Sequence, residues 1–321
     1  MYVVLFILCI ICIILTVEYV CRRKQKSLLE VVHPDWFEDV TKFPEYAFPC
    51  KKNCTEYHSS VKSGLRTMKS KKVVIAGLCI NIESKIDKLV DRVKHLGSFF
   101  GDYKFIVFEN DSSDNTRVLL KENGAILIPC EEDANCKLKA RKAVSSGTFS
   151  RDRMFKMTDY RNRLLKFINN NYSEYDTVCF MDLDLDGPID IRGVAHSFSL
   201  YDTWDSISAH GLNGISITFG LPVYYDVIAY KNYLSSGYIS PNFYSIGDFP
   251  YKVQSGFCGM AFYKMNIIKK VDYTPKDDNY ICEHITFHKN MINNGFDNIY
   301  INPNMLLLSG TQGDTNMYPF Y

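Results

Sequence analysis

Short apolar runs alternate with amphipathic stretches between residues 72 and 186, and this alternation constrains the fold more than any other feature. Four runs have the length and composition of buried strands, at residues 72–80, 104–110, 125–129 and 176–186. The stretches between them, at residues 83–100, 113–124 and 155–172, read as helices. Strands that alternate with helices predict an α/β domain with a mostly parallel, Rossmann-like sheet and helices on both faces.

Two of these predicted helices carry local signals. Residues 83–100 place their apolar side chains on one helical face, namely Ile86, Leu89, Val90, Val93 and Leu96. The shorter helix is expected to begin at Ser113 or Asp114, which are good N-caps, and to end at Gly124.

Acidic residues follow two of the predicted strands. Glu109 and Asp111 follow the second strand, and Asp182, Asp184 and Asp186 occupy every second position at the end of the fourth. In open α/β sheets, ligands bind beyond the carboxyl ends of the strands. Residues two apart in an extended segment share a face, so Asp182 and Asp184 are expected to converge.

Carboxylates at that spacing suit Mg²⁺ or Mn²⁺, which would in turn hold a diphosphate. The plainer alternative is an edge strand or turn with a solvated acidic face. For Glu109 and Asp111 the alternative is a set of turn and cap residues, since Ser, Asp and Asn fill the loop between residues 110 and 116.

The composition excludes some classes of protein. The 321 residues include 37 basic and 36 acidic side chains, a balance unlike that of a dedicated nucleic-acid binder. A hydrophobic content of 46% argues against wholesale disorder. The length suits one catalytic α/β domain with appendages.

The N-terminus predicts a membrane anchor. Residues 2–17 carry no charge, and a basic cluster follows at Arg22, Arg23, Lys24 and Lys26. We expect an uncleaved transmembrane helix at residues 1–21, a stem at residues 22–70 and the catalytic domain at residues 71–321. A cleaved signal peptide is the alternative, although a basic start and a clear cleavage site are lacking. Basic residues after the span slightly favour a cytoplasmic domain over one in the Golgi or ER lumen.

The cysteine pattern leaves the redox compartment open. Among the 11 cysteines, Cys50 with Cys54 and Cys130 with Cys136 are spaced to close small disulfide loops. Three others lie in apolar, strand-like contexts and are expected to be buried thiols: Cys79, Cys179 and Cys258.

The acidic segments together resemble the nucleotide-sugar glycosyltransferases of the GT-A fold. In that fold an acidic strand end such as FENDSSDNT (residues 108–116) holds the nucleoside, and a D-x-D motif such as MDLDLD (residues 181–186) holds metal and diphosphate. Further segments resemble the fungal capsule-associated α-1,3-mannosyltransferase family and related viral and bacterial enzymes. They are YRNRLL (160–165), GLPVYYDVIAY (220–230), VQSGFCGMAFYK (253–264) and CEHITFHKNMINNGF (282–296).

For the donor side, the resemblance implies that Glu109 and Asp111 contact the nucleoside. Asp182 would contact the ribose or the metal and Asp184 the metal; with Asp186 as a third aspartate, which pair binds the ion stays open. Arg161 would pair with phosphate or orient the acidic loop, unless it is a surface helix arginine. Gly256 and Gly259 would let the backbone approach the donor sugar, unless they mark a strand bulge.

For the acceptor side, the resemblance makes Glu283 the candidate general base and His284 a candidate metal or phosphate ligand. Asp226 would bind acceptor or sugar hydroxyls. His284 and His288 lie four apart, but the segment is not H-E-x-x-H, and His288 is expected to pack in the core. A structural helix start is the alternative for Glu283 and His284. Glu283 as a base implies inversion, whereas the mannosyltransferase likeness allows retention.

The leading hypothesis is therefore a membrane-anchored, Mn²⁺- or Mg²⁺-dependent hexosyltransferase. It would move a sugar from a UDP- or GDP-sugar to a hydroxyl of a glycan, glycoprotein or glycolipid, with no nucleic-acid partner. Two alternatives remain: a sugar nucleotidyltransferase, whose Gly-rich basic loop is poorly matched here, and a membrane-tethered binding protein of the same fold without turnover.

Overall fold

The computed structural model describes residues 11–13, 16, 28–130, 151–215, 222–233, 245–275 and 282–310. The predicted anchor at residues 1–21 falls almost entirely outside these ranges. Within them, no helix combines the length and the apolar character needed to cross a bilayer.

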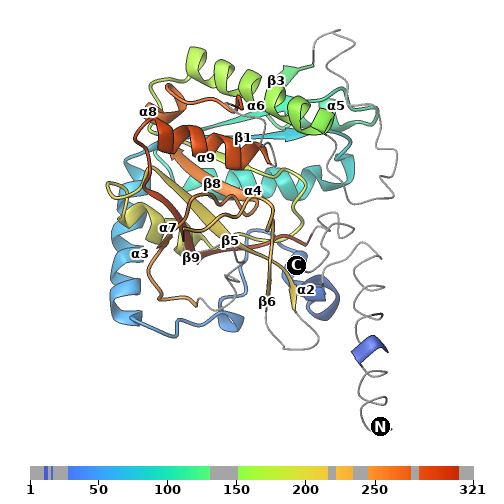
Figure 1. Ribbon diagram of the computed structural model, residues 1–321. Coiled ribbons are helices and arrows are strands. Elements are labelled where there is room, and N and C mark those ends of the chain that lie inside the picture. Colours follow the sequence, from blue (N-terminus) through green and yellow to red (C-terminus); the bar gives the residue numbers. More distant parts are fainter. Residues whose placement is uncertain are drawn as a thin grey trace, which may run out of the picture.

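A central sheet organises the domain (Figure 1). Its strands in the described ranges are β1 (Lys72–Cys79), β2 (Asp102–Glu109), β3 (Ile126–Pro129), β4 (Thr177–Met181), β5 (Ser206–Ile215), β6 (Pro222–Tyr224), β7 (Tyr251–Lys252), β8 (Met260–Lys264) and β9 (Ile299–Leu308). Their order is β3-β2-β1-β4-β8-β5-β9-β7, with β6 paired to β5. The four predicted strands all form, and the fourth ends at Met181, just before the aspartates.

The sheet is mixed rather than mostly parallel, which corrects the expectation from sequence. Strands β1 to β4 are parallel, as the alternation predicts, and β5 is parallel to β9. Strand β8, however, lies antiparallel between β4 and β5. Strand β6 pairs antiparallel with β5, and β7 pairs antiparallel with β9. The alternation of strands and helices reaches only to residue 186, so it carries no information on the second half of the sheet.

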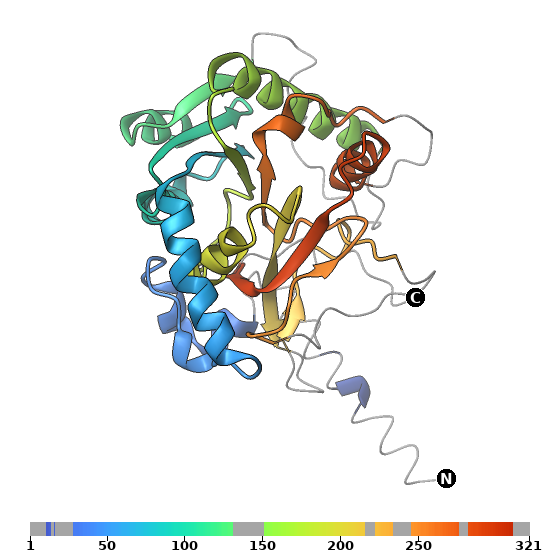
Figure 2. The ribbon, with the colours of Figure 1, turned by 90° about the vertical axis from the view of Figure 1, so that its left-hand side faces the viewer.

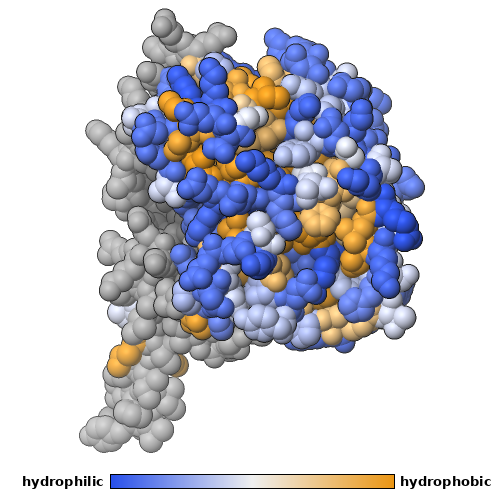
Figure 3. Space-filling view, turned by 180° about the vertical axis from the view of Figure 1, so that it is seen from behind, coloured by the Kyte–Doolittle hydropathy of each residue, from blue (hydrophilic) through white to orange (hydrophobic). Residues whose placement is uncertain are grey.

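Helices cover both faces of the sheet (Figure 1). On one face, α6 (Arg151–Asn171) and α9 (Glu283–Asn293) pack with Val74 and Ala76 of β1. On the other, α4 (Ile86–Ser98), α5 (Thr116–Glu122) and α7 (Ile191–Ser199) pack with Val73 and Ile75. Alternate residues of one buried strand thus enter two separate cores. Seen from behind, the surface is mostly hydrophilic with scattered apolar residues (Figure 3).

The helix signals in the sequence are largely confirmed. The five residues predicted to share the inner face of α4 are all buried. Helix α5 begins at Thr116 with Asn115 at its N-cap, so neither Ser113 nor Asp114 is the cap, although the Asp114 carboxylate accepts a hydrogen bond from the Thr116 amide at 3.0 Å. Gly124 follows the helix with a φ of +82°, a conformation that suits glycine.

The segment expected as a stem is part of the domain from Leu28 onward. It contains α2 (Leu28–Val32), two 3-10 turns at Pro34–Phe37 and Glu45–Ala47, and α3 (Cys54–Lys69). Helix α3 runs alongside the body of the domain (Figure 2). A Cβ atom on Gly64 would lie 1.7 Å from the Ala195 carbonyl oxygen of α7, so the two helices approach closely only because Gly64 lacks a side chain.

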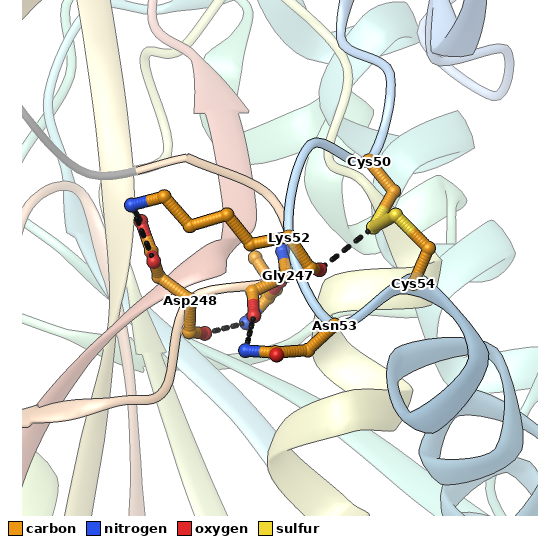
Figure 4. The surroundings of a disulfide bond; sticks show 7 residues. Cys50, Lys52, Asn53, Cys54, Gly247 and Asp248 are labelled. Atoms are coloured by element: carbon orange, nitrogen blue, oxygen red, sulfur yellow. Dashed lines mark hydrogen bonds and ion pairs between the residues drawn. A yellow bond between two sulfur atoms is a disulfide. The ribbon is translucent and has the colours of Figure 1, made fainter.

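A disulfide between Cys50 and Cys54 closes the turn before α3 (Figure 4). Lys52 forms an ion pair with Asp248 at 2.9 Å, and the Asn53 side chain donates to the Gly247 carbonyl at 3.1 Å. These contacts dock the N-terminal segment onto a loop almost 200 residues away. Cys130 is also disulfide-bonded, and its predicted partner, Cys136, lies outside the described residues. The thiols of Cys79, Cys179 and Cys258 are free and buried, as predicted.

Candidate functional site

The acidic residues gather at one edge of the sheet. Strand β1 lies between β2, which ends at Glu109, and β4, which Asp182 follows. The Cys79 thiol at the end of β1 marks their proximity: burial raises its pKa most, and the charges of Glu109 and Asp184 raise it further. Both acidic groups therefore lie within electrostatic reach of one strand end.

An arginine that the sequence did not single out connects the two acids after β2. Glu109 is fully buried, and its carboxylate accepts from the Ser112 amide at 2.5 Å and from Arg117 Nε at 2.6 Å. The same guanidinium donates to Asp111 Oδ1 at 2.8 Å. Arg117 lies in the first turn of α5, where the helix dipole disfavours a cation. A basic residue at that unfavourable position was the one sign in the sequence that Arg117 pairs with nearby acids.

The loops after β1 and β2 are joined into one wall. Asn81 Oδ1 accepts from the Ser113 amide at 2.8 Å, and Thr116 Oγ1 accepts from the Ile82 amide at 2.8 Å. Glu83 Oε1 accepts from the Asn115 side chain at 2.7 Å. Part of the polar sequence between residues 110 and 116 thus forms hydrogen bonds that hold these two loops together. Asp111 keeps a side chain that is 18% exposed.

The three aspartates after β4 have different surroundings. Asp182 is half-buried, and its carboxylate accepts from the Tyr225 hydroxyl at 3.1 Å. Burial first, and then repulsion from Asp184, raises the pKa of Asp182 to about 7. Asp184 is exposed. Asp186 forms an ion pair with Lys85 at 2.9 Å.

The Asp182 and Asp184 pair fits a divalent cation with few protein ligands. Within the described ranges, no group of three or more His, Cys, Asp or Glu side chains is arranged to hold a metal ion. Mg²⁺ commonly binds through one or two carboxylates, with substrate phosphates completing its shell. Burial, and then the charge of Asp184, raises the pKa of Asp182, and a bound cation would favour its ionised form.

A buried ion pair lies behind the acidic edge. Arg161 of α6 donates from Nε to Glu283 Oε1 of α9 at 3.0 Å, and the two side chains are 6% and 9% exposed. The guanidinium also lies 5.5 Å from the ring centre of Phe257 and 5.7 Å from that of Tyr273. Arg161 is therefore not a surface helix arginine, and it brings a full positive charge close to Asp182.

His284 and His288 occupy separate places. His284 stacks on Phe257 with ring centres 3.8 Å apart, and burial lowers its pKa well below the usual value. Its Nδ1 has no hydrogen-bond partner within the part of the chain that the structure describes, and it is not grouped with Asp182 and Asp184. His288 is buried between the hydroxyls of Ser255 and Tyr263, at 3.0 and 3.1 Å, as expected for a core residue.

The two glycines of the SGFCG segment make room for the protein's own side chains. A Cβ atom on Gly256 would lie 2.7 Å from the side chain of Ile301. On Gly259, whose φ is +80°, it would lie 2.9 Å from Leu307 and 3.1 Å from Tyr225. Contact of either glycine with a donor sugar therefore stays a prediction.

Strained backbone concentrates at this edge. In the described ranges, the non-glycine residues with a left-handed φ are Asn53, Asn81, Asp111, Asp226 and Cys258. All but Asn53 lie in the loops around the acidic residues. Such conformations cost free energy and cluster at functional sites. Asp226 lies close enough to Asp182 and Glu283 to be repelled by their charges. Burial first, and then those two charges, raise the pKa of Asp226 well above its usual value.

No protein-family model matches the sequence, and no curated protein matches it. Solved structures resemble the fold at low identity. The mannosyltransferase PcManGT from Pyrobaculum calidifontis, in complex with GDP-Man and Mn²⁺, aligns with a TM-score of 0.45 and 11% identity, over 80% of this chain and 64% of that one. TarS 1–349 of S. aureus aligns with a TM-score of 0.43 and 14% identity, over 74% and 60%.

Glucosyl-3-phosphoglycerate synthase from Mycobacterium tuberculosis, in complex with Mn²⁺, UDP and glucosyl-3-phosphoglycerate, aligns with a TM-score of 0.42 and 11% identity, over 78% of this chain and 74% of that one. The chain spans less than two thirds of the length of the first two proteins. TM-scores below 0.5 do not establish a family, and the likeness to the fungal capsule-associated enzymes stays a prediction.

Proposed function

We propose that this protein is a divalent-metal-dependent glycosyltransferase of the GT-A type that moves a hexose from a UDP- or GDP-sugar to a hydroxyl of a glycan, glycoprotein or glycolipid. The observation that carries the proposal is the Asp182 and Asp184 pair. It lies at the carboxyl edge of the sheet, and only β1 separates its strand from the strand that leads to Asp111.

On the donor side, Asp182 and Asp184 would hold Mn²⁺ or Mg²⁺. When bound, that ion acts as a Lewis acid that offsets the charge developing on the departing diphosphate. The partly exposed carboxylate of Asp111 would accept hydrogen bonds from the nucleoside. Glu109, whose two oxygens are already engaged by Ser112 and Arg117, would keep that loop in shape.

On the acceptor side, Glu283 and Asp226 are the proposed groups. Oε1 of Glu283 accepts from Arg161 Nε at 3.0 Å, and Oε2 accepts a long hydrogen bond from the Cys282 thiol at 3.8 Å. A proton from the acceptor hydroxyl would go to Oε2, the oxygen that the arginine does not engage. A base in that role implies inversion at the anomeric carbon. Arg161 would add positive charge behind the diphosphate.

The membrane anchor at residues 1–21 remains a proposal from the sequence. The basic residues after it favour a cytoplasmic domain, whereas the Cys50–Cys54 disulfide favours an oxidising compartment. Protease protection of the full-length protein in sealed membranes distinguishes these two orientations.

The proposed reaction is tested by turnover of the full-length protein in detergent. UDP- and GDP-sugars are screened for hydrolysis or transfer with Mn²⁺ and with EDTA. We expect one donor to be consumed only with Mn²⁺, with at least a 100-fold loss in Asp184→Asn and no loss in Asp87→Asn, an exposed aspartate of α4. Turnover that persists in EDTA or in Asp184→Asn would contradict the proposal. Formation of pyrophosphate from a nucleoside triphosphate and a sugar phosphate would favour a nucleotidyltransferase instead.

A further inference from the structure

Two cations, Lys85 at the N-cap of α4 and Arg92 within the helix, reach the acidic loop, which comprises residues 182–187. Lys85 precedes the first residue of the helix, and Arg92 follows seven residues later, a spacing that places both on the same side. Sequence patterns gave neither residue a role. Both direct their donors at the backbone of the loop that carries the proposed metal ligands.

Lys85 makes two contacts in the loop. Its Nζ donates to the Asp184 carbonyl oxygen at 2.6 Å and to the Asp186 carboxylate at 2.9 Å. The first contact fixes the backbone of the residue whose carboxylate is exposed. The second ties down Asp186, which is only 20% exposed.

Arg92 extends the same support from deeper in the domain. It is 1% exposed, and it donates from Nη2 to the Leu185 carbonyl and from Nε to the Gly187 carbonyl, both at 2.9 Å. Burying a guanidinium with carbonyl oxygens as its partners is costly. The charges of Asp186 and Asp184 offset part of this cost, since both act against the effect of burial on the pKa of Arg92.

The loop is also fixed from its other side. The Asp182 amide donates to the Gly259 carbonyl and the Asp186 amide to the Ser309 carbonyl, each at 2.9 Å. Leu183 and Leu185 are buried, so the side chains alternate between the core and the acidic face. The loop therefore has little freedom to bring a different pair of aspartates together.

We propose that Lys85 and Arg92 are positioning residues for the metal site: they hold the acidic loop so that Asp182 and Asp184 form the ligand pair, and Lys85 keeps Asp186 out of it. This inference rests on the proposed function. It gives each of the three aspartates a role: Asp182 and Asp184 bind the metal ion, and Asp186 binds Lys85.

A purely electrostatic role for Lys85 would have the opposite sign. A cation near Asp184 repels Mn²⁺, so removing it would tighten Mn²⁺ binding roughly two- to five-fold. Releasing Asp186 as a further carboxylate would tighten it again. Weaker binding in Lys85→Met can therefore come only from lost positioning, provided that the fold is intact.

The test is a Mn²⁺ titration of the full-length protein, followed by the EPR signal of free Mn²⁺, with the metal alone and then with UDP or GDP. We expect Lys85→Met to raise the Kd for Mn²⁺ at least 10-fold and Lys85→Arg to restore it to within about three-fold. Lys94→Met is the matched control, because Lys94 lies on α4, the helix that Lys85 caps, but lines a different hollow with Tyr103 and Asn123. Circular dichroism melts check that each variant is folded.

A second variant keeps the inference testable if Lys85→Met does not fold. Asp186→Asn is expected to bind Mn²⁺ at least 10-fold more tightly than Asp184→Asn. Unchanged or tighter binding in Lys85→Met, or equal losses in Asp186→Asn and Asp184→Asn, would overturn the inference alone. A wild-type protein that binds no Mn²⁺ under any of these conditions would overturn the metal-dependent function as well.

Discussion

Arg161 Nε lies 3.0 Å from Glu283 Oε1, and the pair is enclosed between α6 and α9 with less than a tenth of either side chain exposed. Removing one partner would leave the other charge buried and uncompensated. We therefore expect Arg161→Met to lower the free energy of unfolding by about 3–5 kcal/mol.

A double-mutant cycle with Glu283→Gln, followed by urea unfolding, measures this coupling. The double variant is expected to be clearly more stable than the sum of the single changes implies. Additive effects would show that the pair does not act as a unit, and Arg163→Met serves as the control, because its ion pair with Asp159 is partly exposed.

Two buried histidines outside the acidic edge predict acid sensitivity. Burial lowers the pKa of His196 and of His210 to about 4, whereas an unfolded chain binds protons near pH 6.5. Between pH 6.5 and 4, each histidine binds a proton in the unfolded state but not in the folded state. Each histidine therefore contributes stability that is complete above pH 6.5 and lost as the pH falls toward 4, by at most about 3 kcal/mol.

Urea unfolding between pH 4 and 8 checks this prediction. His210→Gln is expected to flatten the decline in unfolding free energy between pH 6.5 and 4 relative to wild type. His58→Gln, an exposed change in α3, should leave the slope as it is. A slope that is the same in His210→Gln and wild type would show that this histidine does not cause the acid sensitivity.

The Cys50–Cys54 disulfide is expected to stabilise the docked N-terminal segment. A loop this short reduces the entropy of the unfolded chain by an amount worth about 2 kcal/mol. Cys54→Ser should lower the unfolding free energy by about that amount under oxidising conditions. Dithiothreitol should destabilise wild type by more than it destabilises Cys54→Ser; equal sensitivity would mean that this bridge contributes nothing.

Gly247 provides a test of the docking contact itself. Its φ is +97°, and a Cβ atom there would lie 1.7 Å from the Lys52 carbonyl oxygen. Gly247→Ala is expected to lower the unfolding free energy by more than about 3 kcal/mol, because backbone must move. Gly124→Ala is the matched control: its φ is also positive, but nothing lies within 4 Å, so the cost should be about 1 kcal/mol. Equal losses in thermal melts would contradict the contact.

The first half of the fold could be predicted from the sequence because its signals are local. Residues 72–181 alternate between strand and helix patterns, and the apolar face of α4 follows from spacing alone. The antiparallel return of β8 could not be predicted in this way, because strand order depends on packing between distant segments.

In the candidate site, too, the features with a local sequence signal could be predicted, and the contacts between distant residues could not. The acidic ends of β2 and β4 are visible in the sequence, since both follow apolar runs. The pairing of Lys85 with Asp186 joins residues 101 positions apart, and that of Arg161 with Glu283 joins residues 122 apart. No local pattern reveals such pairs, and the first of them distinguishes Asp186, which is held by a lysine, from the exposed Asp184.

The most direct test of the metal and diphosphate site is calorimetric titration of UDP and GDP into the full-length protein, with Mn²⁺ and with EDTA, for wild type, Asp184→Asn and Asp87→Asn. We expect binding of one nucleotide that needs Mn²⁺, is lost in Asp184→Asn and persists in Asp87→Asn. Binding that is equal in EDTA, or unchanged in Asp184→Asn, would show that Asp182 and Asp184 do not form a metal and diphosphate site.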